Sequence, residues 1–375
     1  MSKKLELTVQ MLSPLWAAGA AGKCDRLHET GIIGSMRWWY EAIVRGLDGY
    51  ACDPTSESRC ELSGKEKSDE ERRAKICPAC WLFGCGGWKR RFRLVAGAGS
   101  TEPFSLASLF NKDELNLWWL NEIFQSNLAD RLAFGKVTLT FIFPAGSDGE
   151  ESLNQIKALL SVMAHCGSIG AKGQYGFGQF AWEGKTEPET ALKDIQSFIL
   201  GRQFKKLKNE NDWYSLEKFW YINLPLTGDN AQIKQFKKAN FIGATTRESY
   251  LPVSFDIRYK LQRGNNGLGL RQAYIKRLKE SANDKKLAKK ETREWFGETG
   301  RGSRVFVSHP YKRQPGDNAY NLRVWGFSEK SVAEVVKKEL QNIFGLNEPP
   351  EYITGQSLIG QVQQENREGY EHEVR

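Results

Sequence analysis

Hydrophobic and polar residues alternate in several short runs of this chain, and in other runs hydrophobic residues recur every three or four positions. In the first half, alternation predicts strands at 5–12, 92–96, 137–143 and 178–182. The three-to-four spacing predicts amphipathic helices at 34–47 and 153–165, with an extra helix at 111–127. Without the extra helix, the order is strand, helix, strand, strand, helix, strand, which is the ferredoxin-like arrangement.

The same pattern recurs more loosely in the second half, after a connecting helix at 189–208. Strands are predicted at 219–224, 253–261, 305–309 and 320–327, and helices at 268–279 and 329–344. The turn signal Gln314-Pro-Gly-Asp317 joins the last two strands into a hairpin. We therefore predict an α+β protein of two ferredoxin-like (RRM-like) domains, 1–200 and 201–375, with a polar tail after Pro350.

Composition narrows the class of protein. Of 375 residues, 40% are hydrophobic and 26% are charged, which is typical of a soluble globular protein. No apolar run approaches the ~20 residues of a membrane span. The N-terminus leads directly into the first predicted strand rather than into a secretory signal. Seven cysteines, an odd number, fit a reducing compartment better than a disulfide framework, so we expect a cytoplasmic protein.

Five of the cysteines lie in a soluble, charged insertion at about 50–88. Cys77-Pro-Ala-Cys80 is a C-x-x-C knuckle, whose two sulfurs can face one metal ion, and Cys52 and Cys60 can supply the other two ligands. Cys85 competes with Cys52 for the fourth place. Buried free thiols and a redox C-x-x-C are the alternatives. The favoured interpretation is a zinc (Zn2+) site of four thiolates, because the insertion has too little hydrophobic sequence to fold without one.

Positive charge is concentrated rather than spread. The chain carries a formal net charge of +9, and the basic segment 258–313 alone holds 16 Lys/Arg against 5 Asp/Glu. A second basic knot, Lys89-Arg90-Arg91-Phe-Arg93, directly follows the cysteines. Concentrated positive charge among aromatic residues favours single-stranded nucleic acid. A solvated helix face is the alternative and accounts for part of 285–293.

A glycine-rich loop at 167–178 has five glycines in twelve residues, interleaved with Lys172, Gln174, Tyr175 and Phe177. Glycine lets a backbone approach phosphates, and aromatic rings can stack on bases. The spacing is not that of a dinucleotide-binding fingerprint. A tight helix-to-strand connection would explain two or three of the glycines, but we expect the loop to contact RNA. The candidate RNA contacts are Arg26, Lys89, Arg90, Arg91, Lys172, Gln174, Tyr175, Phe177, Arg258, Arg301 and Arg304.

Several of these motifs, taken in order, resemble the RAMP superfamily of CRISPR proteins. They are Gly34-Ser-Met-Arg37, Cys77-Pro-Ala-Cys-Trp-Leu-Phe-Gly84 and Gly173-Gln-Tyr-Gly-Phe-Gly-Gln179. A narrower resemblance, to the first RAMP-module subunits of type III-B (Cmr) complexes, is carried by Leu12-Ser-Pro-Leu-Trp16, Thr30-Gly-Ile-Ile-Gly-Ser-Met-Arg-Trp-Trp-Tyr-Glu41, Gly87-Trp88 and Gly302-Ser-Arg-Val-Phe-Val-Ser-His309. The resemblance spans nearly the whole chain.

The resemblance implies a non-catalytic, RNA-binding subunit of an RNA-guided effector complex that serves antiviral defence. Such a subunit sits at the end that holds the 3′ part of the guide RNA, beside other RAMP-module subunits, and helps to capture target RNA. By position, Arg37 matches a guide-contacting residue of the family. The cysteines match zinc-binding insertions found in some related folds.

Some members of that superfamily are endoribonucleases, so cleavage is the alternative function. Of the four histidines, His28 is the best placed, in a loop with Asp25 and Arg26. Metal-independent cleavage would use His28, and metal-dependent cleavage would use Asp25. A loop salt bridge and a positively charged loop lying on RNA explain the same residues. We therefore expect a protein that is not an enzyme.

Overall fold

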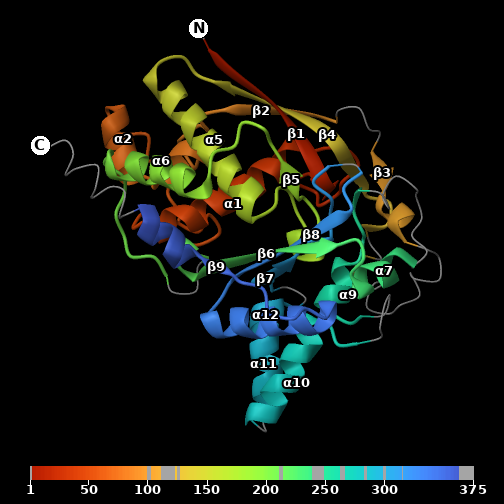
Figure 1. Ribbon diagram of the computed structural model, residues 1–375. Coiled ribbons are helices and arrows are strands. Elements are labelled where there is room, and N and C mark those ends of the chain that lie inside the picture. The colour runs from red at the N-terminus through yellow and green to blue at the C-terminus, as the bar shows by residue number, and fades with distance from the viewer. Residues whose placement is uncertain are drawn as a thin grey trace, which may run out of the picture.

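The computed structural model describes residues 2–98, 103–110, 123–124, 127–210, 214–238, 249–261, 267–282, 285–298, 301–314 and 316–362 (Figure 1). The predicted helix at 111–127 lies almost entirely outside the described residues. The elements of the first half are β1 (Lys3–Leu15), α1 (Glu29–Gly46), α2 (Asp69–Lys75), α3 (Pro78–Phe83), β2 (Arg93–Ala98), β3 (Phe104–Ser105), β4 (Arg131–Phe143), α5 (Ser147–Cys166), β5 (Phe180–Ala181) and α6 (Pro188–Leu200). Those of the second half are β6 (Phe219–Thr227), α7 (Ala231–Lys238), α9 (Ser254–Arg258), α10 (Leu270–Ala282), α11 (Lys285–Phe296), β7 (Val305–Val307), β8 (Ala319–Phe327), α12 (Lys330–Phe344) and β9 (Ile353–Thr354).

These elements form two antiparallel sheets, so the predicted mixture of helices and antiparallel strands is confirmed. The first sheet has the order β2-β4-β1-β5, with β3 pairing the far end of β4. The second has the order β7-β8-β6-β9. If β3 is set aside, the two sheets have the same spatial order of strands. When the strands of each sheet are numbered by their position along the chain, neighbours across the sheet follow the order second, third, first, fourth.

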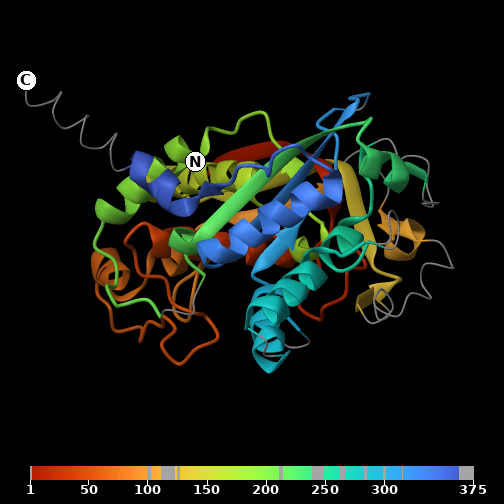
Figure 2. The same ribbon diagram turned by 60° about the horizontal axis from the view of Figure 1, so that its bottom comes forward.

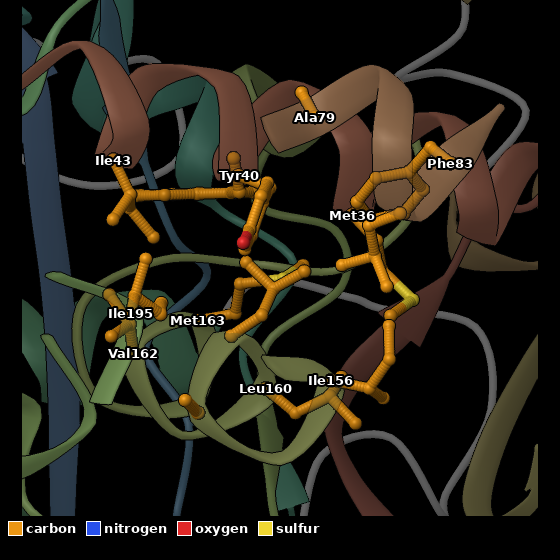
Figure 3. Close-up of a cluster of buried hydrophobic side chains, with 14 of the residues drawn as sticks. Met36, Tyr40, Ile43, Ala79, Phe83, Ile156, Leu160, Val162, Met163 and Ile195 are labelled. Atoms are coloured by element: carbon orange, nitrogen blue, oxygen red, sulfur yellow. The ribbon is translucent and has the colours of Figure 1, made fainter. Parts of the chain in front are cut away.

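Helices α1, α3, α5 and α6 enclose the core of the first half. Figure 3 shows Met36 and Tyr40 of α1 facing Leu160 and Met163 of α5, with Phe83 of α3 beside them. The three-to-four spacing of apolar residues on α1 produces this buried face. Because α3 belongs to the cysteine insertion, the insertion is fastened to the same core as the sheet.

The second sheet lies between α1 and α12. Alternate side chains of β6 point to opposite faces, as the two-residue period of a strand requires. Phe219 and Tyr221 join the core that contains α1, whereas Trp220 and Ile222 join the core covered by α12. In Figures 1 and 2, α10 and α11 project together from the side of α12 and away from both sheets.

One strand prediction is wrong. Residues 253–261 alternate like a strand, but the structure has the short helix α9 there. Every residue of α9 is buried, including Asp256 and Arg258. An element enclosed on all sides shows no amphipathic period, so the alternation of Val253, Phe255 and Ile257 carried no information about its conformation.

Part of the predicted polar tail, residues 351–362, forms secondary structure, and the rest of it, 363–375, lies outside the described residues. Strand β9 pairs with β6, and the helical residues 355–362 that follow bury Leu358 and Val362 against the first half. The connecting helix α6 ends at Leu200, earlier than the predicted 208. Because the two halves share buried contacts, the division of the chain at residue 200 stays a prediction. Among the described residues, no helix is long and apolar enough to cross a membrane.

Candidate metal centre and nucleic-acid interface

The four cysteines Cys52, Cys60, Cys77 and Cys80 come together as predicted. One sulfur from each lies within 4.8 Å of all the others, and all four residues are buried. The Cys52 and Cys80 sulfurs are 3.5 Å apart, and those of Cys52 and Cys77 are 3.9 Å apart. Sulfurs at the corners of a tetrahedral zinc site stand ~3.8 Å apart. The group therefore has the donors and the spacing to hold one metal ion, and Cys85 lies outside it.

The local sequence explains how the knuckle forms. Cys77 caps the N-terminus of α3, its sulfur accepting the backbone N–H of Cys80 at 3.4 Å, and Pro78 occupies the first turn of that helix. The Cys60 sulfur accepts the backbone N–H of Cys77 at 3.3 Å. Hydrogen bonds from Cys60 and Cys77 lower the pKa of Cys52, so one thiol of the group ionises ahead of the others. Thiolates are the form that binds a metal.

A row of charged residues on α1 faces the cysteines: Arg37 is partly buried, and Glu41 and Arg45 are buried. Arg37 donates to Glu41 at 2.7 Å, to the Gly84 carbonyl oxygen at 2.8 Å and to the Cys80 sulfur at 3.3 Å. Burial opposes the charge on Arg37, but the neighbouring Cys80 and Glu41 hold its pKa above the usual range. Arg45, one turn beyond Glu41, donates to the Cys52 carbonyl oxygen at 3.1 Å. Arg37 thus contacts the cysteine group, and its predicted contact with guide RNA stays a prediction.

The basic knot after the cysteines divides into exposed and structural residues. Lys89 and Arg90 are exposed. The Arg91 guanidinium lies 4.0 Å from the Trp88 ring centroid and 3.1 Å from the Asp148 carboxylate of α5. Arg91 therefore connects the insertion to α5. The sequence prediction had assigned its charge to an RNA contact instead.

All five glycines of the loop at 167–178 have a packing reason. A Cβ atom at any of them would lie 2.6 Å or less from a neighbouring heavy atom. At Gly178 the clash is with the Ile169 carbonyl oxygen, at 1.9 Å, and φ is +82°. The argument that a helix-to-strand connection explains only two or three glycines is wrong, because this loop passes between α1, β1 and the second half at close range.

Two predicted RNA contacts, Phe177 and Arg258, are corrected by their burial. Phe177 is fully buried in a cluster with Trp16 and Phe255, and Tyr175 packs against Phe255 as well. Arg258 is 1% exposed and donates to the Phe296 carbonyl oxygen and the Ser303 hydroxyl, at 2.6 and 2.7 Å. The Phe177 ring thus belongs to the core, whereas Tyr175 is only partly buried and its predicted contact with RNA stays a prediction.

The exposed cations lie elsewhere. Arg26 is exposed beside α1, and Arg301 is exposed just before β7. The projecting hairpin of α10 and α11 carries a larger group, of which Lys276 and Arg293 pair with Glu280 and Glu298 on the same hairpin. Its exposed cations are Lys276, Arg277, Lys279, Lys286, Lys289, Lys290 and Arg293.

Lys172 and Gln174, together with Ser168 of the same loop, line a cavity of about 250 Å³ between the loop, α1 and β7. Lys172 adopts a left-handed backbone conformation, with φ of +60°, which is uncommon outside glycine. Arg304 lies 5.3 Å from the ring centroid of Tyr214, another residue of the cavity wall. No sequence signal predicted this cavity, because its walls come from segments up to 290 positions apart.

His28 and Asp25 form a pair. The His28 Nε2 and Asp25 Oδ1 atoms are 2.6 Å apart, and this contact lowers the pKa of Asp25. His28 is largely covered, whereas the Asp25 side chain is 73% exposed. The arrangement is the loop salt bridge that the sequence offered as one alternative.

Comparison with known proteins identifies relatives of the first half. Residues 8–181 match the family model of the RAMP superfamily. No curated protein sequence matches the chain significantly. Among solved structures, Cmr1 from Pyrococcus furiosus in its apo form has 13% identity and a TM-score of 0.46, over 87% of this chain and 88% of that one. Chains of the Type III-B Cmr-beta complex bound to cognate target RNA have 12% identity and TM-scores of 0.47 and 0.41, over 92% of this chain and 100% and 99% of theirs. Likeness at this level does not specify a function.

Proposed function

Because residues 8–181 match the RAMP superfamily, we propose that this protein is a non-catalytic RNA-binding subunit of a type III-B CRISPR effector complex. In that role it sits at the end holding the 3′ part of the guide RNA, beside other RAMP-module subunits. It helps to capture target RNA for antiviral defence, in the cytoplasm.

The proposed fold is a pair of ferredoxin-like domains. Each half contains the order strand, helix, strand, strand, helix, strand once its inserted elements are set aside. Each sheet has the strand order that a split βαβ arrangement generates, with the third strand between the first and second. This repetition supports two domains of one type.

The observation that carries the RNA proposal is the placement of positive charge. The segment 258–313 has 16 Lys/Arg against 5 Asp/Glu, and seven of these cations are exposed on the hairpin of α10 and α11. Arg301 and Arg304 continue the charge toward the glycine-rich loop. Charge of this density on one part of a surface attracts a polyanion, chiefly through release of its counterions. Single-stranded RNA is the polyanion that the superfamily favours.

We assign the cysteine group to zinc. Four buried thiols at tetrahedral spacing form the donor set that Zn2+ prefers in structural sites. Arg37 donates an N–H to the Cys80 sulfur, and Arg37, Glu41 and Arg45 together place net positive charge beside the thiols. When bound, the metal would fix the insertion at 50–88 against α1. It would have no open coordination position for chemistry.

Binding of single-stranded RNA to the full chain tests the RNA proposal. Fluorescence anisotropy over a series of salt concentrations should show affinity that falls steeply with salt. The double variant Lys289→Ala/Lys290→Ala should flatten the slope of log K against log salt by about 0.7 for each phosphate that the variant no longer neutralises. Lys157→Ala, an exposed cation on α5, is the matched control and should leave the slope unchanged. Absence of RNA binding at low salt, or an unchanged slope in the double variant, would contradict the proposal.

The alternative function is an endoribonuclease that processes or cleaves CRISPR-related RNA. The contact of His28 with Asp25 favours it, because a carboxylate that orients an imidazole is a common element of acid–base catalysis. We prefer the non-catalytic role, since no further titratable group is bonded to this pair among the described residues.

A further inference from the structure

The cavity beside the glycine-rich loop has aromatic walls. It lies where α1, the loop, β7 and β8 meet, and it is lined by Trp38, Tyr214, Phe306 and Trp325 together with polar groups of the loop. Its volume of about 250 Å³ is below the range of roughly 300–1,000 Å³ typical of sites for whole drug-sized ligands. The space therefore suits one small planar group better than a complete nucleotide.

The aromatic walls support one another. Phe306 stacks on Trp325, with ring centroids 5.3 Å apart and planes 11° from parallel. Trp38 meets Tyr214 edge to face at 4.9 Å and packs against Phe327 at 5.2 Å. Because these rings pack against one another, they are fixed in position before a ligand binds. Binding should therefore cost little side-chain conformational entropy.

One polar group of the cavity wall lacks a partner. The indole N–H of Trp325 is buried and has no hydrogen-bond acceptor among the described residues. By contrast, the indole of Trp220, in the neighbouring strand, donates to the Ser328 hydroxyl at 2.8 Å. A buried donor without an acceptor is costly, so an acceptor that reaches the Trp325 indole would be stabilised.

The cavity also adjoins positive charge. Lys172 is one of its lining residues, Arg304 lies over Tyr214, and Arg301 is exposed next to the lining residue Gly302. A ligand that places a flat ring inside and an anionic backbone outside would satisfy both features. Unpaired bases of single-stranded nucleic acid have this shape, because they can be splayed out and stacked on aromatic side chains.

We propose that the cavity receives one unpaired nucleobase of a single-stranded RNA. The base packs against the braced aromatic rings and accepts a hydrogen bond from the Trp325 indole, while the flanking phosphates face Lys172, Arg301 and Arg304. This inference rests on the proposed function and adds to it a single-base subsite. A paired base cannot enter, since it stays within its duplex.

A scan of abasic positions tests the proposal. The full chain is titrated with a single-stranded RNA and with the same RNA carrying an abasic site at successive positions. One position should weaken binding about tenfold, within the range found for base–aromatic stacking, and the others should have little effect. Trp325→Phe should weaken binding of the intact RNA several-fold and reduce the effect at that position. Because Trp325 is fully buried, the smaller Phe ring should also lower thermal stability, so the loss of the position-specific effect, and not the affinity alone, reports the subsite.

Gly302→Leu provides a second variant that removes no existing side chain. A Cβ at Gly302 would lie 3.5 Å from the Tyr214 hydroxyl, an ordinary contact, so the larger side chain can fill the cavity mouth without backbone strain. It should abolish the position-specific effect and leave the salt dependence intact. If RNA binds with strong salt dependence but no abasic position or cavity variant matters, the base subsite is wrong and the proposed function stands. If no RNA binds, the proposed function itself fails.

Discussion

Arg37 on α1 lies with its guanidinium 3.3 Å from the sulfur of Cys80, and the same guanidinium forms an ion pair with Glu41 at 2.7 Å. One side chain thus connects the cysteine group to a buried carboxylate on its own helix. Burial raises the pKa of Glu41, and its contact with Arg37 opposes that rise. The helix that the sequence linked to RNA serves, in the structure, as the charged wall of the metal centre.

Arg37→Met should therefore weaken the metal centre. The variant leaves the buried Glu41 with the more distant Arg45 as its partner, which should lower the free energy of unfolding by about 2–4 kcal/mol. Loss of zinc to a chelator should become about 10- to 100-fold faster, as for other groups that support metal ligands. Arg37→Lys should have a stability and a rate of zinc loss between those of the wild type and Arg37→Met, because an ammonium cannot contact Glu41, Gly84 and Cys80 together. Unaltered zinc release in Arg37→Met would contradict this role.

The cysteine group should bind about one zinc ion per chain, as a single four-thiolate site does. Elemental analysis of the purified protein measures this directly. Cys60→Ser should lose the metal and expose 50–88 to proteolysis. Cys85→Ser is the matched control, because Cys85 is close in sequence but lies outside the group of four. Equal metal loss in both variants would show that the fourth ligand has been misassigned.

Gly178→Ala should be strongly destabilising. It introduces a Cβ at a positive φ and 1.9 Å from the Ile169 carbonyl oxygen, so the backbone of the loop has to move. We expect a loss of about 2–4 kcal/mol in the free energy of unfolding, measured with denaturant. Gly34→Ala is the contrasting variant: it lies on α1 with no atom within 4 Å of the new Cβ, and it should stabilise by about 0.5–1 kcal/mol.

Periodicity predicted the elements that have one buried and one exposed face. Strand β1 and helices α1 and α5 are of this kind. The bounds of β1 were predicted to within three residues, whereas α1 and α5 begin five and six residues before their predicted starts. The helix α9 has no exposed face, so its sequence has no period from which to predict it. The cysteine group was predictable because a C-x-x-C knuckle constrains its own geometry, and Cys52 and Cys60 needed only to lie within reach of it.

The RNA contacts were less predictable, because sequence does not reveal burial. Arg258 stands in the most basic segment, yet the structure surrounds it with carbonyl and hydroxyl acceptors and aromatic rings. A spacing of four residues between Arg37, Glu41 and Arg45 was the one signal that these charges share a helix face turned to a common partner. The cavity wall, in contrast, joins Trp38 to Trp325, and only the packing of the two halves brings them together.

His165 should make the protein less stable at low pH. Burial lowers the pKa of its imidazole to about 4, below the ~6.5 of an unfolded chain. Between these values the unfolded state binds more protons, so the free energy of unfolding decreases as pH falls from about 6.5 to 4. A fully buried group would contribute ~3 kcal/mol, and because this ring is partly exposed we expect about 1–2 kcal/mol. The difference between wild type and His165→Gln, followed by denaturant unfolding from pH 7 to 4, isolates this contribution.

The last prediction is that the protein does not cut RNA. Cleavage requires a base, an acid or metal ions, and a group that stabilises the charged phosphate. His28 and Asp25 contact each other at 2.6 Å, and a contact of this kind within one loop has a structural explanation without catalysis. Target cleavage by a reconstituted complex that carries His28→Ala or Asp25→Ala in this subunit tests the point, with Lys157→Ala as the matched control. We expect every cut to persist, with at most weaker target capture. Loss of one specific cut, with assembly and target affinity unchanged, would establish the endoribonuclease alternative.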